Sequence, residues 1–400
     1  MHFELNDAQR EWQMKARKFA QEEIRPISLA RDQTPGAAAT WDWDIIRKGS
    51  KLGFRTAAVP KEWGGHGIDF VTQAIVMAEL AKADSAISKA FSQNWKWSHL
   101  IAGACTEEQK RRFLTPFLAD DTYVLGMGGT EPNSGSDNRY PPLDAPKAGI
   151  RLKAERRGDE WILNGEKTFI ANGGVGKLFF AAARTNPDVP AQQGTTIFMV
   201  PIDTPGFRIG KIFNKSGWRF YQNGELVFEN ARVPHSNILG EVNGGHTARG
   251  KGSAEFNDFE LAANALGVCD DASESAMRFS MASSRGGRRL FDHQLVQLKL
   301  NEMHMLTEAL RSFVLRIAAE MDRAAHMQAN VVLLMNFSCD VIQKVTTLNL
   351  DIHATGGEAM DAHADKLVRD AIIWTHLGGD ASQRLKAVRR LGAGPPVAAH

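Results

Sequence analysis

The spacing of apolar residues changes its period twice along this chain of 400 residues. Up to about residue 120, apolar side chains recur every three or four positions, as on one face of a helix. Between about 121 and 235 they alternate in short runs that turn residues separate, which is typical of β-strands. The helical spacing then returns. We therefore predict an α+β chain of three parts: a helical domain over 1–120, a β-domain over 121–235 and a helical bundle over 236–400.

Local signals place the helices of the first part. Asn6 and Gln9 form a capping-box pattern ahead of an apolar face, and we expect Pro26 to end this first helix. The triplet Thr106-Glu107-Glu108 opens another helix by the same capping logic. Further helices are predicted over 41–52, 70–83 and 87–104.

The central part carries turn signals of its own. Gly158-Asp159 predicts a turn, and Asn164-Gly165 is a strong signal for a β-hairpin. Strands are predicted over 178–183, 195–202, 207–212 and 225–229. In the last part, apolar residues trace one face of a long helix that suits an antiparallel bundle: Leu306, Leu310, Phe313, Val314 and Ile317.

Charge and cysteine usage narrow the class of protein. The chain has 48 Lys and Arg against 46 Asp and Glu, a net charge of +2, which argues against a general nucleic-acid binder. Cys105, Cys269 and Cys339 are too far apart for a CxxC zinc site or a disulfide framework. No signal peptide is visible, and the longest uncharged apolar run, 178–183, is far shorter than the roughly 20 residues that span a bilayer. We expect a cytoplasmic protein without a membrane span.

Three weaker signals have ordinary interpretations. The segment 173–178 resembles a phosphate loop but lacks its first glycine and its Ser/Thr, so we interpret it as a hairpin loop. Lys96, between Trp95 and Trp97, is either a lysine that extends to solvent over packed aromatic rings or a pocket residue that meets an anion. A polar cluster could bind a metal, but a solvated turn is favoured: Asp351, His353, Glu358, Asp361, His363 and Asp365.

Four segments together resemble the signatures of the flavin-dependent acyl-CoA dehydrogenase family. GTEPNSGSD at 129–137 resembles the family's TEPxxGSD, and LNGEKTFIANG at 163–173 is similar to its LNGxKxWITNG. VFENARVP at 227–234 looks like VFEDVRVP, and RDA at 369–371 sits where the family has RDA. These segments occur in family order across almost the whole chain. The resemblance implies a helical N-terminal domain, a β-barrel-like domain and a C-terminal four-helix bundle.

The same resemblance implies a function. Family members desaturate an acyl-CoA thioester between Cα and Cβ with FAD, pass electrons to an electron-transfer flavoprotein or similar acceptor, and form homodimers or homotetramers. By this resemblance Met127, Gly129 and Thr130 contact the isoalloxazine ring. The other residues that it assigns to FAD are Gly135 and Ser136 near the pyrophosphate, Phe169 at the stacking position, Ala171 near the ring, and Arg285, His293 and Gln294 toward the FAD of a neighbouring subunit.

The catalytic base of the family is missing from both of its usual positions. The glutamate that follows RDA falls on Gly378, and the alternative position on a helix after the β-domain falls on Asn257. Glu255, Asp258 and Glu260 lie beside that second position, and we predict Asp258 as the base because its neighbour aligns against the substrate.

Other departures affect the cofactor. Ala171 replaces a threonine, which removes a hydrogen bond of roughly 0.5–1.5 kcal/mol. Ser283 replaces an arginine, so Arg285 has to take its place, and Asp351 brings a negative charge to a pyrophosphate contact. Three hypotheses remain open: a dehydrogenase with a displaced base acting on an unusual acyl group such as a cyclic or polar one, a flavin-dependent monooxygenase of the same fold with His376 in the base loop, and a catalytically silent partner subunit.

Overall fold

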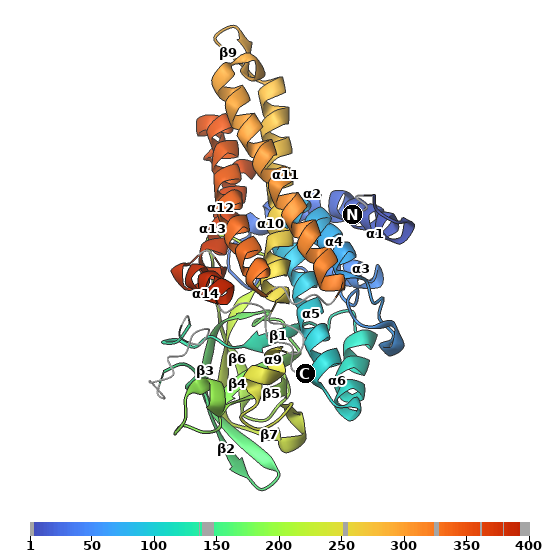
Figure 1. Cartoon of the computed structure of the whole chain (residues 1–400), viewed down its shortest axis with the longest axis vertical. Helices are drawn as coiled ribbons and strands as arrows, with labels where there is room; N and C mark the ends of the chain where they lie inside the picture. The colour runs from blue at the N-terminus through green and yellow to red at the C-terminus, as the bar shows by residue number, and fades with distance from the viewer. Residues whose placement is uncertain are drawn as a thin grey trace.

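The computed structural model describes residues 4–135, 137, 148–250, 255–323, 328–360, 362–378 and 380–392. A β-sheet domain occupies one end of the long axis, a helical bundle extends from it to the other end, and the N-terminal helices lie along one side of both (Figure 1). The predicted α+β fold class is therefore confirmed. The domain boundaries at 120 and 235 stay a prediction.

The N-terminal helices begin where their capping residues predict. The Asn6 side chain accepts from the Gln9 N–H while the Gln9 side chain accepts from the Asn6 N–H, which completes the capping box. Thr106 and Gln109 repeat this arrangement. The helices are α1 (Asp7–Phe19), α2 (Arg25–Gln33), α3 (Trp43–Lys51), α4 (Phe70–Ala83), α5 (Ser85–Ala104) and α6 (Glu107–Ala119), with a 3₁₀ turn η2 (Lys61–Trp63).

Pro26 does not end the first helix, so that prediction is wrong. A π-helical turn, η1 (Ala20–Ile24), joins α1 to α2, and the chain stays helical as far as Gln33. Proline clashes with the carbonyl four residues before it. Widening the turn before Pro26 relieves this clash, and Pro26 then occupies the first turn of α2, where its missing N–H costs little.

The central domain is one eight-stranded sheet with the order β6-β7-β3-β2-β4-β5-β8, and β1 pairs in parallel with β4. Most of β4 and β5 is buried, and the two strands pair along their full length. The strands are β1 (Leu125–Gly128), β2 (Lys153–Arg157), β3 (Glu160–Ala171), β4 (Leu178–Arg184), β5 (Thr195–Pro201), β6 (Phe207–Ile212), β7 (Asn223–Pro234) and β8 (Ile238–Leu239), with a short helix α8 (Ala191–Gly194) and a 3₁₀ turn η3 (His235–Asn237).

Asn164-Gly165 is not a hairpin turn, which corrects the second local prediction. Both residues lie inside β3, where the pairing with β7 shifts register between Leu163 and Gly165. Gly165 has φ +135°, a conformation that suits glycine at a β-bulge. The turn lies instead between β2 and β3, at Gly158-Asp159, as the sequence predicts.

The C-terminal helices bury the face that the sequence marks. Leu310, Val314 and Ile317 of α11 are fully buried in the main core, which joins the bundle to the N-terminal helices. The elements are α9 (Gly245–Gly250), α10 (Phe256–Ala282), α11 (Gln294–Asp322), α12 (Gln328–His353), α13 (His363–Leu377) and α14 (Ala381–Gly392), with the strands β9 (Ser284–Arg285) and β10 (Arg288–Arg289) and the 3₁₀ turns η4 (Leu290–Asp292) and η5 (Ala354–Gly357).

One helical stretch in the described part of the chain, Asn330–Gly357, is long and apolar enough in composition to cross a membrane, with a mean hydropathy of 1.3. Asp340 and Lys344 interrupt it, so a search for uncharged runs does not find it. Inside the protein, 67% of its most apolar window is buried. Burial of this degree is what the core helix of a bundle requires.

We predict that Gly267→Ala destabilises the protein by about 1–3 kcal/mol, although alanine favours helices. A Cβ on Gly267 of α10 would lie 2.3 Å from the Ala78 carbonyl oxygen and 2.8 Å from the Ala81 Cβ of α4, and backbone cannot rotate away. Urea unfolding measures the loss. Gly392→Ala in α14, where nothing lies within 4 Å, is the control. Equal stabilities for the two variants would contradict the prediction.

Candidate functional site

The structure brings the predicted ring-contacting residues together where β1 meets β3. Met127 lies in β1 and is almost fully buried, whereas Gly129, two residues on, has open space where a Cβ would lie, and Thr130 is exposed. The Thr168 N–H donates to the Thr130 carbonyl over 2.9 Å, and the Lys167 ammonium reaches the Gly129 carbonyl over 3.3 Å. The end of β1 is therefore fastened to β3, and Thr130 lies at the solvent-facing edge.

Glu131, the acid of the TEPxxGSD resemblance, is an anchor rather than a solvent-facing group. Its carboxylate pairs with Lys167 over 2.6 Å, and both side chains are buried. The same carboxylate accepts from the backbone N–H groups of Arg151 and Leu152 over 2.8 and 2.9 Å. One carboxylate thus holds together the segment after β1, the strand β3 and the two residues directly before β2.

The aspartate of the same signature stabilises a tight turn. Asp137 accepts from the Ser134 hydroxyl and from the Gly135 N–H, each over 2.8 Å, and from the Gly149 N–H over 3.2 Å. Gly135 is half-buried at this turn. Ser136, the other residue predicted near the pyrophosphate, lies outside the described residues.

Phe169 presents its ring to solvent from a strained backbone. Its φ is +53°, which is unusual for an aromatic residue, and its side chain is 54% exposed. The ring stacks on Phe213 with centroids 3.9 Å apart, and the Phe169 carbonyl accepts from the Asn223 amide over 2.8 Å. Ala171 ends β3 beside it and pairs with Asn223. A strained residue that neighbours fix in place is typical of a functional site.

Lys215 supports this arrangement from inside. Its ammonium donates to the Asn223 side-chain oxygen over 2.5 Å and to the Tyr221 carbonyl over 2.6 Å. Burial lowers the pKa of Lys215 to about 7, and the charge of Asp370 on α13 opposes part of this shift. Hydrogen bonds thus link Lys215 through Asn223 to the backbone of Phe169, which carries the exposed ring. The sequence analysis did not identify Lys215 or Asn223, since neither belongs to a motif that we used.

The helices α5 and α10 close the other side of this region. The Asn94 side chain of α5 accepts from the Leu125 N–H of β1 over 2.9 Å. Lys96, two residues on, donates to the Asn257 side-chain oxygen over 2.8 Å and lies 4.5 Å from the Trp97 ring. Lys96 therefore does not extend freely to solvent; it meets the position at which the sequence resemblance places an alternative base. Asn257 in turn donates to Asp258 over 3.2 Å.

At the end of α13, Met335 of α12 packs against Gly378, the position where the family has its glutamate. Gly378 is buried, and a Cβ there would lie 2.2 Å from the terminal methyl of Met335 of α12. The Gly378 N–H donates to the Trp374 carbonyl over 3.1 Å, and the Cys339 thiol lies 3.5 Å from the same oxygen. Burial raises the pKa of Cys339 to about 12, and Asp258 contributes to this rise. Asp258 is itself buried, and its charge is felt at Cys339.

Glu260, another acid beside Asn257, is fully engaged elsewhere. Its carboxylate lies 2.5 Å from the Lys89 ammonium and 2.5 Å from the Ser92 hydroxyl, both of α5, and all three side chains are buried. Burial lowers the pKa of Lys89, while the charge of Glu260 opposes this shift. Glu260 is thus a structural ion pair between α5 and α10.

The residues predicted to reach a neighbouring subunit lie at the far end of the molecule (Figure 1). The β9–β10 hairpin turns at Gly286-Gly287, both with positive φ, and exposes Arg285 and Arg288. The His293 ring contacts the Arg285 carbonyl over 3.1 Å, and Gln294 begins α11. Within one chain these residues do not meet Thr130 or Phe169.

Most of the polar cluster and the whole of the segment 173–178 lie within the described residues. No three His, Cys, Asp or Glu side chains converge as a metal site in the part of the chain that the structure describes. In the polar cluster, Asp351 pairs with Lys299 over 2.8 Å, and His353 stacks on Phe279; Asp361 lies outside the described residues. The segment 173–177 connects β3 to β4, which lie on either side of β2 in the sheet order, so the predicted hairpin loop is wrong.

Comparisons with known proteins agree along the whole chain. Three family models match in order: acyl-CoA dehydrogenase N-terminal domain at 6–121, middle domain at 126–231 and C-terminal domain at 254–391. An acyl-CoA dehydrogenase of Bacillus subtilis (strain 168) is 30% identical over 372 residues, 92% of this chain and 94% of its own length.

Two solved structures share the fold over 98% of this chain at 29% identity. One is butyryl-CoA dehydrogenase from Megasphaera elsdenii, covered to 100%, with a TM-score of 0.88. The other is a chain from a structure described as the electron transferring flavoprotein of Acidaminococcus fermentans, covered to 99%, with a TM-score of 0.89.

We predict that Glu131→Ala costs about 3–5 kcal/mol in the free energy of unfolding, because it takes the neutralising carboxylate away from the buried Lys167 ammonium. The matched control is Glu229→Ala, whose pair with Arg208 is solvent-exposed and is worth about 0–1 kcal/mol. Denaturant titration of both variants measures the difference. A loss below about 1 kcal/mol for Glu131→Ala would show that the anchor is dispensable.

A second prediction concerns pH. The folded state binds a proton at Lys215 only below about pH 7, whereas an unfolded lysine keeps it up to about 10.5, so stability rises with pH between these values. Lys215→Met removes this rise, and thermal unfolding across the pH range measures it. The control is Lys211→Met, because Lys211 is exposed nearby, 5.4 Å from the Phe213 ring. An unchanged slope for Lys215→Met would refute the assignment.

Proposed function

Since the chain belongs to the acyl-CoA dehydrogenase family, whose members are flavin-dependent oxidoreductases acting on CH–CH bonds, we propose that it oxidises the Cα–Cβ bond of an acyl-CoA thioester, with Asp258 as the base. The observation that supports the proposal is that Gly378 offers no carboxylate and the Met335 methyl occupies the space of a Cβ there, whereas Asp258 on α10 is a buried carboxylate. The acyl group and the base are the parts of this proposal that experiment has to establish.

The exposed residues at the junction of β1 and β3 fit a flavin. Thr130 offers a hydroxyl, Gly129 leaves open space for a close approach, and the Phe169 ring stands clear of the sheet. The arginines of the β9–β10 hairpin suit the phosphates of an FAD held by a second subunit. FAD, when bound, accepts a hydride from the Cβ of the thioester. Thr130, Phe169 and Ala171 would hold its ring, and Arg285, His293 and Gln294 would contact it across a homodimer or homotetramer interface.

Of the two acids of α10 closest in sequence to Asn257, Asp258 rather than Glu260 is the one that we propose for proton abstraction. Glu260 is committed to Lys89 and Ser92. Asp258 is buried and receives a hydrogen bond from Asn257, the residue at the family's alternative base position. A carboxylate at this point would take the Cα proton, and hydrogen bonds to the thioester carbonyl would stabilise the enolate-like charge.

The acyl group that this site would take is polar or cyclic rather than long and straight. Lys96 brings a buried ammonium to Asn257 beside the Trp97 ring, which suits a polar substituent. Trp95, which could have lined a pocket, instead donates its indole N–H to the Phe54 carbonyl over 2.5 Å within the core. An electron-transfer flavoprotein or a similar acceptor would reoxidise the flavin.

We predict that Asp258→Asn slows flavin reduction by at least about 100-fold, the lower end of a general base's contribution. The assay mixes the FAD-loaded enzyme anaerobically with a panel of acyl-CoAs and follows bleaching of the oxidised flavin band. Glu255→Gln, three residues earlier, is the control and should leave the rate within a few-fold of wild type. A normal rate in Asp258→Asn would move the base to another residue.

A gain-of-function variant tests the geometry independently. Met335→Ala removes the side chain that fills the space at Gly378, so Gly378→Glu with Met335→Ala should accommodate a carboxylate at the family position. In the Asp258→Asn background this pair should recover part of the lost rate, whereas Met335→Ala alone should recover none. Absence of recovery in a well-folded triple variant would show that a carboxylate at position 378 cannot replace Asp258 as the base.

The monooxygenase hypothesis is kept because His376 is exposed in the last turn of α13, two residues before Gly378. It expects oxygen-dependent hydroxylation when reduced flavin is supplied and no bleaching by any acyl-CoA. A preparation that binds FAD but does neither would favour the silent partner subunit.

A further inference from the structure

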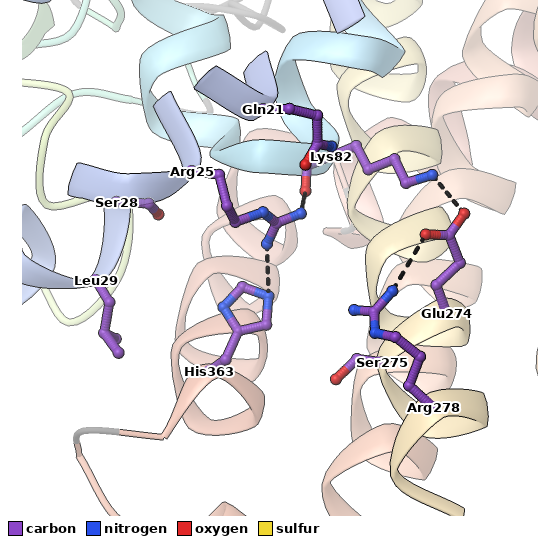
Figure 2. A pocket seen from close by; sticks show the side chains of 9 residues that line it. All are labelled: Gln21, Arg25, Ser28, Leu29, Lys82, Glu274, Ser275, Arg278 and His363. Carbon is purple, nitrogen blue, oxygen red and sulfur yellow. Dashed lines mark hydrogen bonds and ion pairs between the residues drawn. The ribbon is translucent and has the colours of Figure 1, made fainter. Parts of the chain in front are cut away.

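A polar cavity lies apart from the residues assigned to the flavin, at the seam between the N-terminal helices and the bundle (Figure 2). Its volume is about 520 Å³. Four helical segments form its wall: η1–α2, α4, α10 and α13. The one large apolar side chain in the wall is Leu29. The lining residues are Gln21, Arg25, Ser28, Leu29, Lys82, Glu274, Ser275, Arg278 and His363. A cavity with this lining suits a small charged ligand better than an apolar one.

A buried carboxylate fixes one side of the cavity. Asp271 of α10 accepts two hydrogen bonds from the Arg25 guanidinium, over 2.6 and 3.1 Å, and lies 2.5 Å from the His363 ring. Arg25 also donates to the Lys82 carbonyl. Burial alone would raise the pKa of Asp271, but the hydrogen bond and charge of His363, with those of Arg25, outweigh it and hold that pKa low. Arg25 and His363 are therefore fixed in position before any ligand arrives.

The opposite side has two cations and one acid. Glu274 pairs with Lys82 and, at 3.4 Å, with Arg278, and Figure 2 shows both cations meeting this single carboxylate. Counting Arg25 and Asp271 as well, three cationic side chains face two carboxylates, so the cavity keeps an excess positive charge before His363 is considered. The contact of Arg278 is long, and its side chain is 66% exposed, so it can turn toward a ligand.

The π-helical turn η1 places residues of the near side. Gln21 lies within it and Arg25 follows it directly. A π turn adds a residue to the helix and so changes the direction of the side chains that follow, and such turns occur frequently at functional sites. Without the extra residue, Arg25 would be rotated away from Asp271 by about 100°.

We propose that this cavity binds a small dianion of the phosphate monoester class, with Lys82 and Arg278 supplying the mobile charges and Arg25 and His363 the fixed ones. Arginine and lysine are the side chains that most often recognise phosphate oxygens. Glu274 is the competitor that the anion displaces from the two cations. This site is separate from the proposed reaction site, and its test does not depend on turnover.

Isothermal titration calorimetry of the FAD-loaded protein with inorganic phosphate tests the proposal. Arg278→Gln should weaken phosphate binding about tenfold or more, since a hydrogen bond to a charged group is worth about 1.5–3 kcal/mol. Glu274→Gln should strengthen it several-fold, because it removes the competing carboxylate. General destabilisation would not raise phosphate affinity in one variant and lower it in the other, since both residues lie on the same face of α10.

The matched control is Arg316→Gln, which removes a similar i,i+4 ion pair, with Glu320, outside the cavity. This variant should bind phosphate as the wild type does. The unfolding temperatures of all three variants should lie within a few degrees of the wild-type value. No heat of binding at millimolar phosphate in the wild-type protein, or equal affinities for wild type, Arg278→Gln and Glu274→Gln, would overturn the proposal. Binding that only hairpin variants such as Arg285→Gln abolish would place the phosphate at the proposed FAD site instead.

Discussion

The buried contact between Glu131 and Lys167 is the constraint on which the region around β1 depends. A buried carboxylate and a buried ammonium are each costly alone, so they hold together the segments that carry them. Because Glu131 also takes two backbone N–H groups, the exposed Thr130 is anchored immediately before a fixed point. The same strand that supplies Lys167 presents Phe169 two residues later. A short stretch of sequence thus combines a rigid interior with a ring that is free to meet a ligand.

The sequence predicts the fold where local rules decide it. Capping at Asn6 and Thr106, the apolar face of α11 and the turn at Gly158-Asp159 are each set by a few neighbouring residues. Two of the wrong local predictions, those at Pro26 and Asn164-Gly165, share a cause. In both places the chain absorbs a turn-forming signal by a local irregularity, a π turn or a β-bulge, because the surrounding element is stabilised by packing over a longer range.

The candidate site divides in the same way. Short motifs locate Thr130, Phe169 and Ala171, and a backbone hydrogen bond from Thr168 to Thr130 brings the two motifs together. They do not reveal Lys215, Asn223 or Met335, whose importance comes from contacts with residues far away in the sequence. The sequence shows that Gly378 is no base, whereas only the packing of Met335 shows that the space itself is filled.

The β9–β10 hairpin, at the opposite end of the molecule from the sheet, has a consequence for how the protein would hold its cofactor. A ligand that contacts both the sheet domain and this hairpin must be bound by two chains. Its binding then depends on the concentration of the protein, because the two chains first have to associate. If FAD is held as proposed, dilution would lower cofactor occupancy even when no cofactor is removed from solution, and the cellular abundance of the protein would set the fraction that is loaded.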